Sequence, residues 1–212
     1  MAPTSPSPRW ALAPVLLALA CGAWGATGGD TRHLETKWEA KKVEADLKTH
    51  QATLRGDVKV FHGDFSVTAD RADASALEFK NSHWVFSGNV HIRSEEHGNL
   101  ASDRATVDFR DNEIAKALVT GMPAQFEQTG ADEGVLARGH AASIEYEVGA
   151  GTVRMTDDQK AWLSYGTSQI TSPVIVYDIR AQQVQASGTE GDKRVHVTIV
   201  PKQDNARREK KP

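Results

Sequence analysis

The stretch Phe86-Ser-Gly-Asn-Val-His-Ile92 has a counterpart 32 residues upstream, Leu54-Arg-Gly-Asp-Val-Lys-Val60. Each copy contains an apolar residue, then Gly, then Asp or Asn, then Val and a further Val or Ile. A second shared phrase follows each copy, Ala69-Asp-Arg-Ala-Asp73 after the first and Ser102-Asp-Arg-Ala-Thr106 after the second. A fixed period of this size is typical of stacked supersecondary units, none of which buries its apolar face alone. The sequence therefore predicts an array of β-hairpin-like units.

The repeat continues in less regular form toward the C-terminus. Arg138-Gly-His-Ala141 occupies the place of the earlier Asp-Arg-Ala phrases, and Thr171-Ser-Pro173 follows it by one more period. Alternating apolar residues between these phrases predict strands, with turns at 62–64, 95–99 and 111–112. Pro123 indicates a bulge or an edge strand, because proline has no N–H to donate to a strand ladder. We expect four recognisable units and a degenerate fifth at the N-terminal end.

The segment from Leu34 to Leu47 has two competing interpretations. Its many Ala, Glu and Lys residues favour a helix by intrinsic propensity. Its apolar residues also alternate, as two short strands would require. We favour strands, because pairing with a neighbouring strand overrides a weak intrinsic preference.

Residues 1–25 have the features of a secretory signal peptide. A basic start at Arg9 precedes an apolar run from Trp10 to Ala20, and small residues follow. Cleavage near residue 25 or 26 would accompany export of the protein and remove Cys21, the single cysteine. Without it the mature chain forms no disulfide. The alternative is a lipoprotein box at Ala18-Leu-Ala-Cys21, which would leave the mature chain anchored by a lipid on Cys21.

The charge distribution argues against nucleic-acid binding. The formal net charge is −3, and the terminal segment 202–212 alone holds five basic residues. The body, residues 26–201, is therefore acidic, whereas phosphate neutralisation needs clustered Lys and Arg. We expect segment 202–212 to be a solvated, disordered tail.

The sequence contains no pattern that indicates catalysis, a metal site or a cofactor. None of the eight histidines has the spacing of a zinc motif, and no nucleophile elbow or phosphate-binding glycine loop is present. Asp157 and Asp158 fall where a hairpin turn is due, so turn chemistry explains them. The recurrence of Asp70-Arg71 and Asp103-Arg104 at one repeat position favours a structural role at the start of a strand. We therefore do not expect an enzyme.

The ordered set of phrases resembles the OstA-like family of periplasmic lipopolysaccharide-transport proteins. The resemblance runs from Leu34 to Pro201. The phrases that carry it are Gly56-Asp-Val, Gly88-Asn-Val, Ala69-Asp-Arg71, Gly121-Met-Pro-Ala-x-Phe126, Gly139-His-Ala-x-x-Ile-x-Tyr146 and Lys193-Arg-Val-x-Val-x-Ile-Val-Pro201.

This resemblance implies a fold and a task. The fold would be an open, twisted antiparallel β-jelly roll whose interior is a hydrophobic groove for the acyl chains of lipopolysaccharide. Protomers would join end to end by strand addition and bridge the periplasm. The N-terminal edge would meet an inner-membrane partner resembling LptC, and the C-terminal edge an outer-membrane partner resembling LptD.

Physical chemistry agrees with such a task. An acyl chain of roughly a dozen methylenes costs about 10 kcal/mol to expose, at about 0.8 kcal/mol each. We expect the groove to be lined by large apolar side chains on one alternation of the strands, with Leu54 and Val107 left to the core. The predicted groove residues are Trp38, Val58, Val60, Phe65, Phe86, Val90, Ile92, Phe109, Phe126, Tyr146 and Trp162.

Two alternatives remain at this stage. The predicted groove residues could form an ordinary dry core, because a period of two does not show which face opens. The protein would then be a structural β-repeat protein without a lipid ligand. A periplasmic hydrolase or lyase could also have a site assembled only by folding.

Since the body has no basic cluster, we expect the head group of a bound lipid to stay largely in solvent.

Overall fold

The computed structural model describes residues 36–94, 98–129, 136–188 and 194–199. The predicted signal peptide, Cys21 and the basic tail lie outside these residues. The described elements belong to one compact unit, Leu34–Pro212. Within the described ranges, no helix has the length and apolar character needed to cross a membrane.

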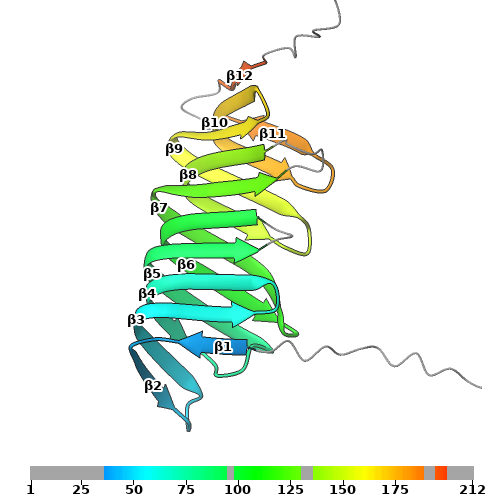
Figure 1. Ribbon diagram of the computed structural model, residues 1–212. Coiled ribbons are helices and arrows are strands. Elements are labelled where there is room, and N and C mark those ends of the chain that lie inside the picture. The colour runs from blue at the N-terminus through cyan, green and yellow to red at the C-terminus, as the bar shows by residue number, and fades with distance from the viewer. Residues whose placement is uncertain (1–35, 95–97, 130–135, 189–193, 200–212) are drawn as a thin grey trace, which may run out of the picture. The chain divides into compact units, whose positions relative to one another are not determined.

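The described residues form twelve strands in a single antiparallel sheet (Figure 1). Their order is β1-β3-β4-β5-β6-β7-β8-β9-β10-β11, with β2 pairing with β3 and β12 with β10. The two ends of this order do not pair with each other, so the sheet is open. The all-β, antiparallel prediction is confirmed. The strands are β1 Thr36–Glu39, β2 Lys42–Asp46, β3 Gln51–His62, β4 Phe65–Ala74, β5 Asn81–Ser94, β6 Gly98–Arg110, β7 Glu113–Thr129, β8 Leu136–Glu147, β9 Thr152–Tyr165, β10 Ser168–Asp178, β11 Gln183–Ser187 and β12 His196–Thr198.

The helix-prone segment 34–47 forms strands β1 and β2, as we favoured. Both strands pair with β3, Trp38 lying opposite Val60 and Val43 opposite Leu54. Pairing with β3 satisfies the backbone groups that a helix would otherwise satisfy internally. Tertiary pairing thus overrides the helical propensity of this segment.

The repeated Gly-Asx phrase bends the long strands. Gly56 and Asp57 in β3 have φ angles of 77° and 48°, and Gly88 and Asn89 in β5 have 75° and 46°. The strand register shifts at both places. Left-handed conformations of this kind suit Gly, Asn and Asp, and they produce a bulge that turns the strand. The phrase that repeats in the sequence is therefore the bend of each unit.

Aspartates on neighbouring strands hold these bends in place. The side-chain amide of Asn89 donates to Asp70 Oδ2 at 2.9 Å, and the Met122 N–H donates to Asp103 Oδ2 at 3.3 Å. The Asp-Arg phrases are thus structural, as expected, but they lie in the middle of β4 and β6 and not at a strand start. Asp157 is also inside a strand, β9, where its Oδ2 accepts the Ala142 N–H at 2.9 Å. The predicted turn at Asp157 is therefore wrong.

The bends fold the sheet over on itself, so that the two halves of each strand belong to two facing layers (Figure 1). One layer presents a row from Val60 through Ile92 to Phe126, and the other a row from Leu54 through Phe86 to Ile144. Gly121-Met-Pro123 lies at such a bend, in a bulge of β7 between two paired strands. Phe79 lies in the loop between β4 and β5 and packs into the core.

Candidate functional site: the apolar interior between the layers

Ten of the eleven predicted groove residues belong to the interior between the two layers. Seven of them have exposed fractions between 1% and 4%, and Tyr146 has 5%. Trp38 and Phe65 are partly buried and pack against the same cluster. Alternation along the strands brings these side chains to one face, which the bends then fold inward. The interior residues are Trp38, Val58, Val60, Phe65, Phe86, Val90, Ile92, Phe109, Phe126 and Tyr146.

Trp162 is the exception, and its predicted place in the groove is wrong. It pairs with His140 in β8, and His140 pairs with Gln125 in β7, both of which are exposed. The neighbouring Leu163 is buried instead, with 1% exposed. Trp162 therefore lies on the outer face of the sheet. The sequence already indicates the outer position of Trp162. The apolar residues Val153, Met155 and Leu163 of the same strand all have odd numbers, whereas 162 is even, and alternate residues of a strand face opposite sides.

The N-terminal end of the interior is filled by aromatic rings. The ring centroids of Trp84 and Trp38 are 5.1 Å apart, and those of Phe79 and Phe109 are 4.6 Å apart. Phe79 stacks on Trp84 with centroids 4.9 Å apart. Edge and offset contacts of this kind add to the stabilisation from area burial alone. Trp84 and Phe79 were not among the predicted groove residues. Trp84 could have been included, because it lies two residues before Phe86 in the same strand and therefore faces the same side.

The C-terminal end of the interior is more aliphatic and includes tyrosines. Ile144, Met155 and Ile175 are fully buried there, and Tyr177 is 2% exposed. Burial raises the pKa of the Tyr146 and Tyr177 hydroxyls above their usual value, so both stay neutral. The interior of the described chain thus offers apolar surface and neutral rings to a ligand.

The middle of the interior is nearly closed in this structure. A cavity of about 10 Å³ remains between the layers, bounded by residues of both, such as Ile92, Phe126 and Tyr146. That space holds about one water molecule at most. A chain of methylenes therefore cannot enter unless the layers move apart.

A larger hollow of about 530 Å³ opens beside this cavity. The two share the lining residues Phe65, Ile114 and Val148, so the hollow borders the interior, and we call it the mouth. It lies where three hairpin turns, 62–65, 110–113 and 147–151, approach one another. Four charged residues line the mouth, namely Asp64, Arg110, Glu113 and Arg180.

The mouth combines an apolar floor with charged walls. Arg180 donates to the carbonyl of Val148 at 3.3 Å, and Asp64 accepts a hydrogen bond from Ser94. A ligand with apolar chains and a charged head would therefore meet suitable chemistry at both ends. This grouping could not be predicted from the sequence, because Arg110 and Arg180 lie 70 residues apart. The expectation that a lipid head group stays largely in solvent remains a prediction, but the mouth places Arg110 and Arg180 within one hollow.

His62 ties the layers together at the N-terminal side of the mouth. Its Nε2 donates to the carbonyl of Asn112 at 2.5 Å, and its Nδ1 accepts from the Thr36 hydroxyl at 2.8 Å. A carbonyl oxygen only accepts, so Nε2 carries the proton of this bond. The ring also stacks on Phe79 with centroids 4.8 Å apart. This link joins β1, the end of β3 and the turn between β6 and β7.

No group of three or more His, Cys, Asp or Glu side chains is placed to hold a metal ion in the part of the chain that the structure describes.

Comparison with known proteins identifies the family. Residues 71–183 match the family described as "LptA/(LptD N-terminal domain) LPS transport protein". The lipopolysaccharide export system protein LptA of Haemophilus influenzae is 34% identical over 131 residues, which cover 62% of this chain and 71% of that protein. A crystal structure of LptH, the LptA-homologous periplasmic component of lipopolysaccharide transport in Pseudomonas aeruginosa, covers 80% of this chain and 98% of its own, at 21% identity and a TM-score of 0.45. The chain belongs to the LptA/(LptD N-terminal domain) family of lipopolysaccharide-transport proteins.

Proposed function

We propose that this protein carries lipopolysaccharide through the periplasm, with the acyl chains between the two layers and the head group at the mouth. The observation that carries the proposal is that an apolar interior lies directly beside an open, charged mouth. Membership of a lipopolysaccharide-transport family supports it. The residues in contact with the acyl chains would be the ten interior residues named above.

Loading requires the layers to separate, and the architecture allows this. The layers are connected covalently along the bends, whereas at the mouth they meet through side chains and the His62 link. Opening the mouth therefore breaks few ladder hydrogen bonds. The gain from burying acyl chains, about 0.8 kcal/mol for each methylene, would offset the lost contacts between the layers.

Both ends of the sheet have features that favour end-to-end assembly. β1 and β2 pair only with β3, and β11 and β12 only with β10, so each end has an unpaired strand edge within the described residues. Exposed apolar side chains accompany these edges, with Leu47 75% exposed after β2 and Ile199 71% exposed after β12. Unpaired edges are templates for strand addition. We propose that the N-terminal edge receives an LptC-like partner, the C-terminal edge an LptD-like partner, and either edge a second copy of this chain.

The tryptophans allow a direct test of the acyl-chain route. Trp38 and Trp84 lie in the interior and Trp162 on the outer face, so lipopolysaccharide with brominated acyl chains should quench only the first two. In the Trp162→Phe variant, whose remaining described tryptophans are interior, we expect strong quenching. In a Trp38→Phe/Trp84→Phe variant, which reports on Trp162, we expect little. Equal quenching of both variants, or none in either with the proteins folded, would contradict the proposal.

A further inference from the structure

A hollow on the outer face is lined mainly by residues that the acyl-chain route does not use; only Leu100 and Phe126 also bound the interior cavity. Its volume is about 640 Å³, within the range of small-molecule sites, and it lies over strands β5 to β9. Strand pairing brings His91, Ala101, Gln125, His140 and Trp162 into one row across its surface. The small side chain of Ala101 leaves room between its larger neighbours.

An aromatic platform forms one side of this outer hollow. The ring of His140 lies nearly parallel to the indole of Trp162, with centroids 5.2 Å apart and an interplanar angle of 21°. Trp162 is partly buried, so part of its indole is accessible from solvent. A flat apolar surface with a polar rim suits the C–H face of a sugar ring, whose hydroxyls point outward from its edge.

The hydrogen-bonding groups around this platform are unused. Among the described residues, the side chains of Arg93, Asn99 and Gln125 have no hydrogen-bond or ion-pair partner, although all three line the hollow. Two arginines line the hollow. Of these, Arg138 forms an ion pair with Glu127 at 3.2 Å, whereas Arg93 does not form one within the described residues. The hollow therefore keeps one uncompensated guanidinium together with free amide groups.

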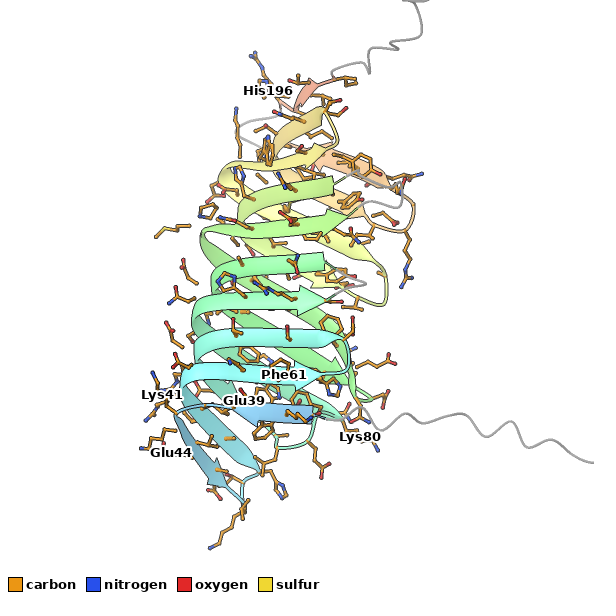
Figure 2. All side chains as sticks on the ribbon, viewed as in Figure 1. Glu39, Lys41, Glu44, Phe61, Lys80 and His196 are labelled. Carbon is orange, nitrogen blue, oxygen red and sulfur yellow. The ribbon has the colours of Figure 1, made fainter. Side chains whose placement is uncertain are left out.

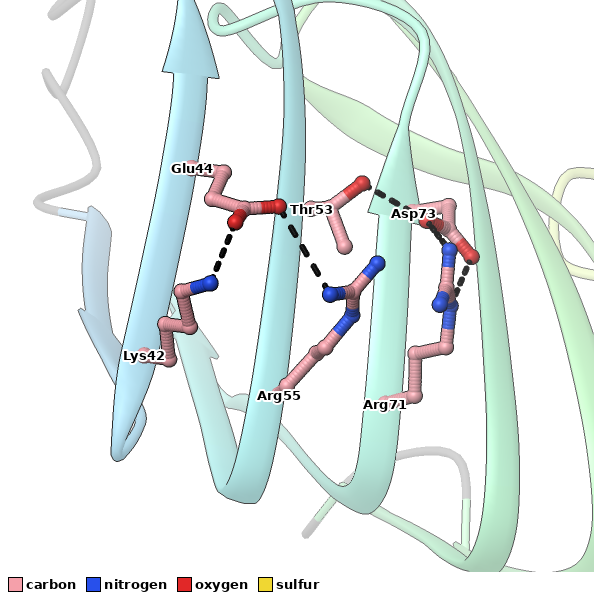
Figure 3. Close-up of polar contacts among 6 residues, drawn as sticks. All are labelled: Lys42, Glu44, Thr53, Arg55, Arg71 and Asp73. Carbon is pink, nitrogen blue, oxygen red and sulfur yellow. Dashed lines mark hydrogen bonds and ion pairs between the residues drawn. The ribbon is translucent and has the colours of Figure 1, made fainter.

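The outer face over β2 to β4 is different. There Glu44 lies between Lys42 and Arg55, and Asp73 accepts two hydrogen bonds from Arg71, so the charges are paired with one another (Figure 3). Exposed side chains such as Lys41 and Glu39 at that end also have ion-pair partners (Figure 2). The unpaired groups of the hollow are thus not a general property of this surface.

We infer that the outer hollow binds an anionic saccharide, a sugar ring that bears a phosphate or carboxylate. The ring would stack on Trp162, its hydroxyls would bond to Gln125 and Asn99, and its anionic group would pair with Arg93. The site goes beyond the proposed function, because it lies on the face opposite to the interior. The saccharide could be the sugar part of the transported glycolipid or a separate anionic glycan. An oligonucleotide fits less well, since the chain is acidic overall and the hollow has one free guanidinium.

Calorimetric titration of the purified protein with lipid-free ligands tests this inference. The probes are the phosphorylated oligosaccharide of deacylated lipopolysaccharide, the same compound after dephosphorylation, and an oligouronate. We expect binding of the first or third probe, and at least about tenfold weaker binding of the dephosphorylated compound, a loss of about 1.4 kcal/mol. Binding of the first probe alone would assign the site to the glycolipid, and binding of both to anionic glycans in general.

Variants separate the hollow from the rest of the surface. Trp162→Ala and Arg93→Gln should each weaken binding by about tenfold or more. Trp162→Phe should retain an aromatic platform and bind, and Arg154→Gln, an exposed arginine of β9 outside the hollow, should behave like the unaltered protein. Absence of binding to every anionic probe, equal binding by all variants, or tighter binding of a single-stranded oligonucleotide would each overturn the inference. Because no probe has acyl chains, failure here leaves the quenching test of the interior unaffected.

Discussion

Trp84 and Trp162 are the same residue type on opposite faces of one sheet. Trp84 is fully buried between the layers, where it contacts Trp38 and Phe79. Trp162 lies on the outer face beside unpaired polar groups. In a sheet that folds over on itself, a shift of one residue moves a side chain from a dry interior to a hydrated surface. The comparison teaches that the two faces have different tasks, burial inside and polar recognition outside.

Truncating the two tryptophans gives the largest expected contrast. Trp84→Ala should lower the free energy of unfolding by about 3–5 kcal/mol, because it removes a fully buried indole and leaves a cavity. Trp162→Ala should cost about 1 kcal/mol or less, as is usual for a surface position. Urea unfolding monitored by circular dichroism measures both. Similar losses for the two variants would remove the distinction between the faces.

The bend at Gly88 separates the two halves of β5, so its removal should have the next largest effect on the free energy of unfolding. Gly88 has a φ angle of 75°, and a Cβ there would collide with the Asp70 carboxylate. Gly88→Ala should cost about 1–3 kcal/mol in the free energy of unfolding, the range for strained backbone positions.

Gly149→Ala is the matched control for the bend, because a Cβ at Gly149 has nothing within 4 Å. It should change the urea midpoint little, by the equivalent of about 0.5 kcal/mol at most. If Gly88→Ala were as mild as this control, the bend would not depend on the left-handed glycine.

The charge pairs of the outer face should contribute least to the free energy of unfolding. The hydrogen bonds from Arg71 hold the pKa of Asp73 below its usual value, and Thr53 donates a further bond at 2.8 Å. A lowered pKa in the folded state means that this stabilisation is present above the unfolded pKa of about 3.9 and is lost as the pH falls through the lowered folded value.

Asp73→Asn should therefore cost less than about 1 kcal/mol at pH 7, since both partners are substantially exposed. The difference from the unaltered protein should shrink at pH 3. Urea midpoints at the two pH values measure it, with Glu78→Gln, an exposed loop residue without an ion pair in the described chain, as the control. A difference that grew on acidification would contradict the assigned sign.

The sequence predicted the hairpin array well, because a period of 32 residues and strict alternation are strong local signals. It did not reveal that the Gly-Asx phrase bends β3 and β5, since an alternating pattern does not report a positive φ angle. In β4, β6 and β8 the inward-facing residues change from odd to even positions, or the reverse, at the bend. The side of the sheet on which a residue lies therefore could not be extrapolated along the whole chain. Most interior residues were nevertheless found, because large apolar side chains are rarely placed on the outer face.

The mouth and the outer hollow could not be predicted. Arg110 and Arg180 converge only because turns of distant hairpins meet, and Arg93, Gln125 and Trp162 only because β5 to β9 are stacked in register. No local spacing encodes either group. The family match supports lipid transport over the alternative of a structural repeat protein, although the interior is nearly closed in this structure.

Photo-crosslinking at two adjacent residues of β8 tests the central claim most directly. Tyr146 faces the interior beside the mouth, whereas Glu145 faces outward, away from the hollow, and pairs with Lys116 at 2.8 Å. With p-benzoylphenylalanine at each position in turn and folding verified by circular dichroism, we expect lipopolysaccharide adducts at position 146 and few or none at 145. Adducts at 145 equal to or exceeding those at 146 would contradict a lipid route through the interior.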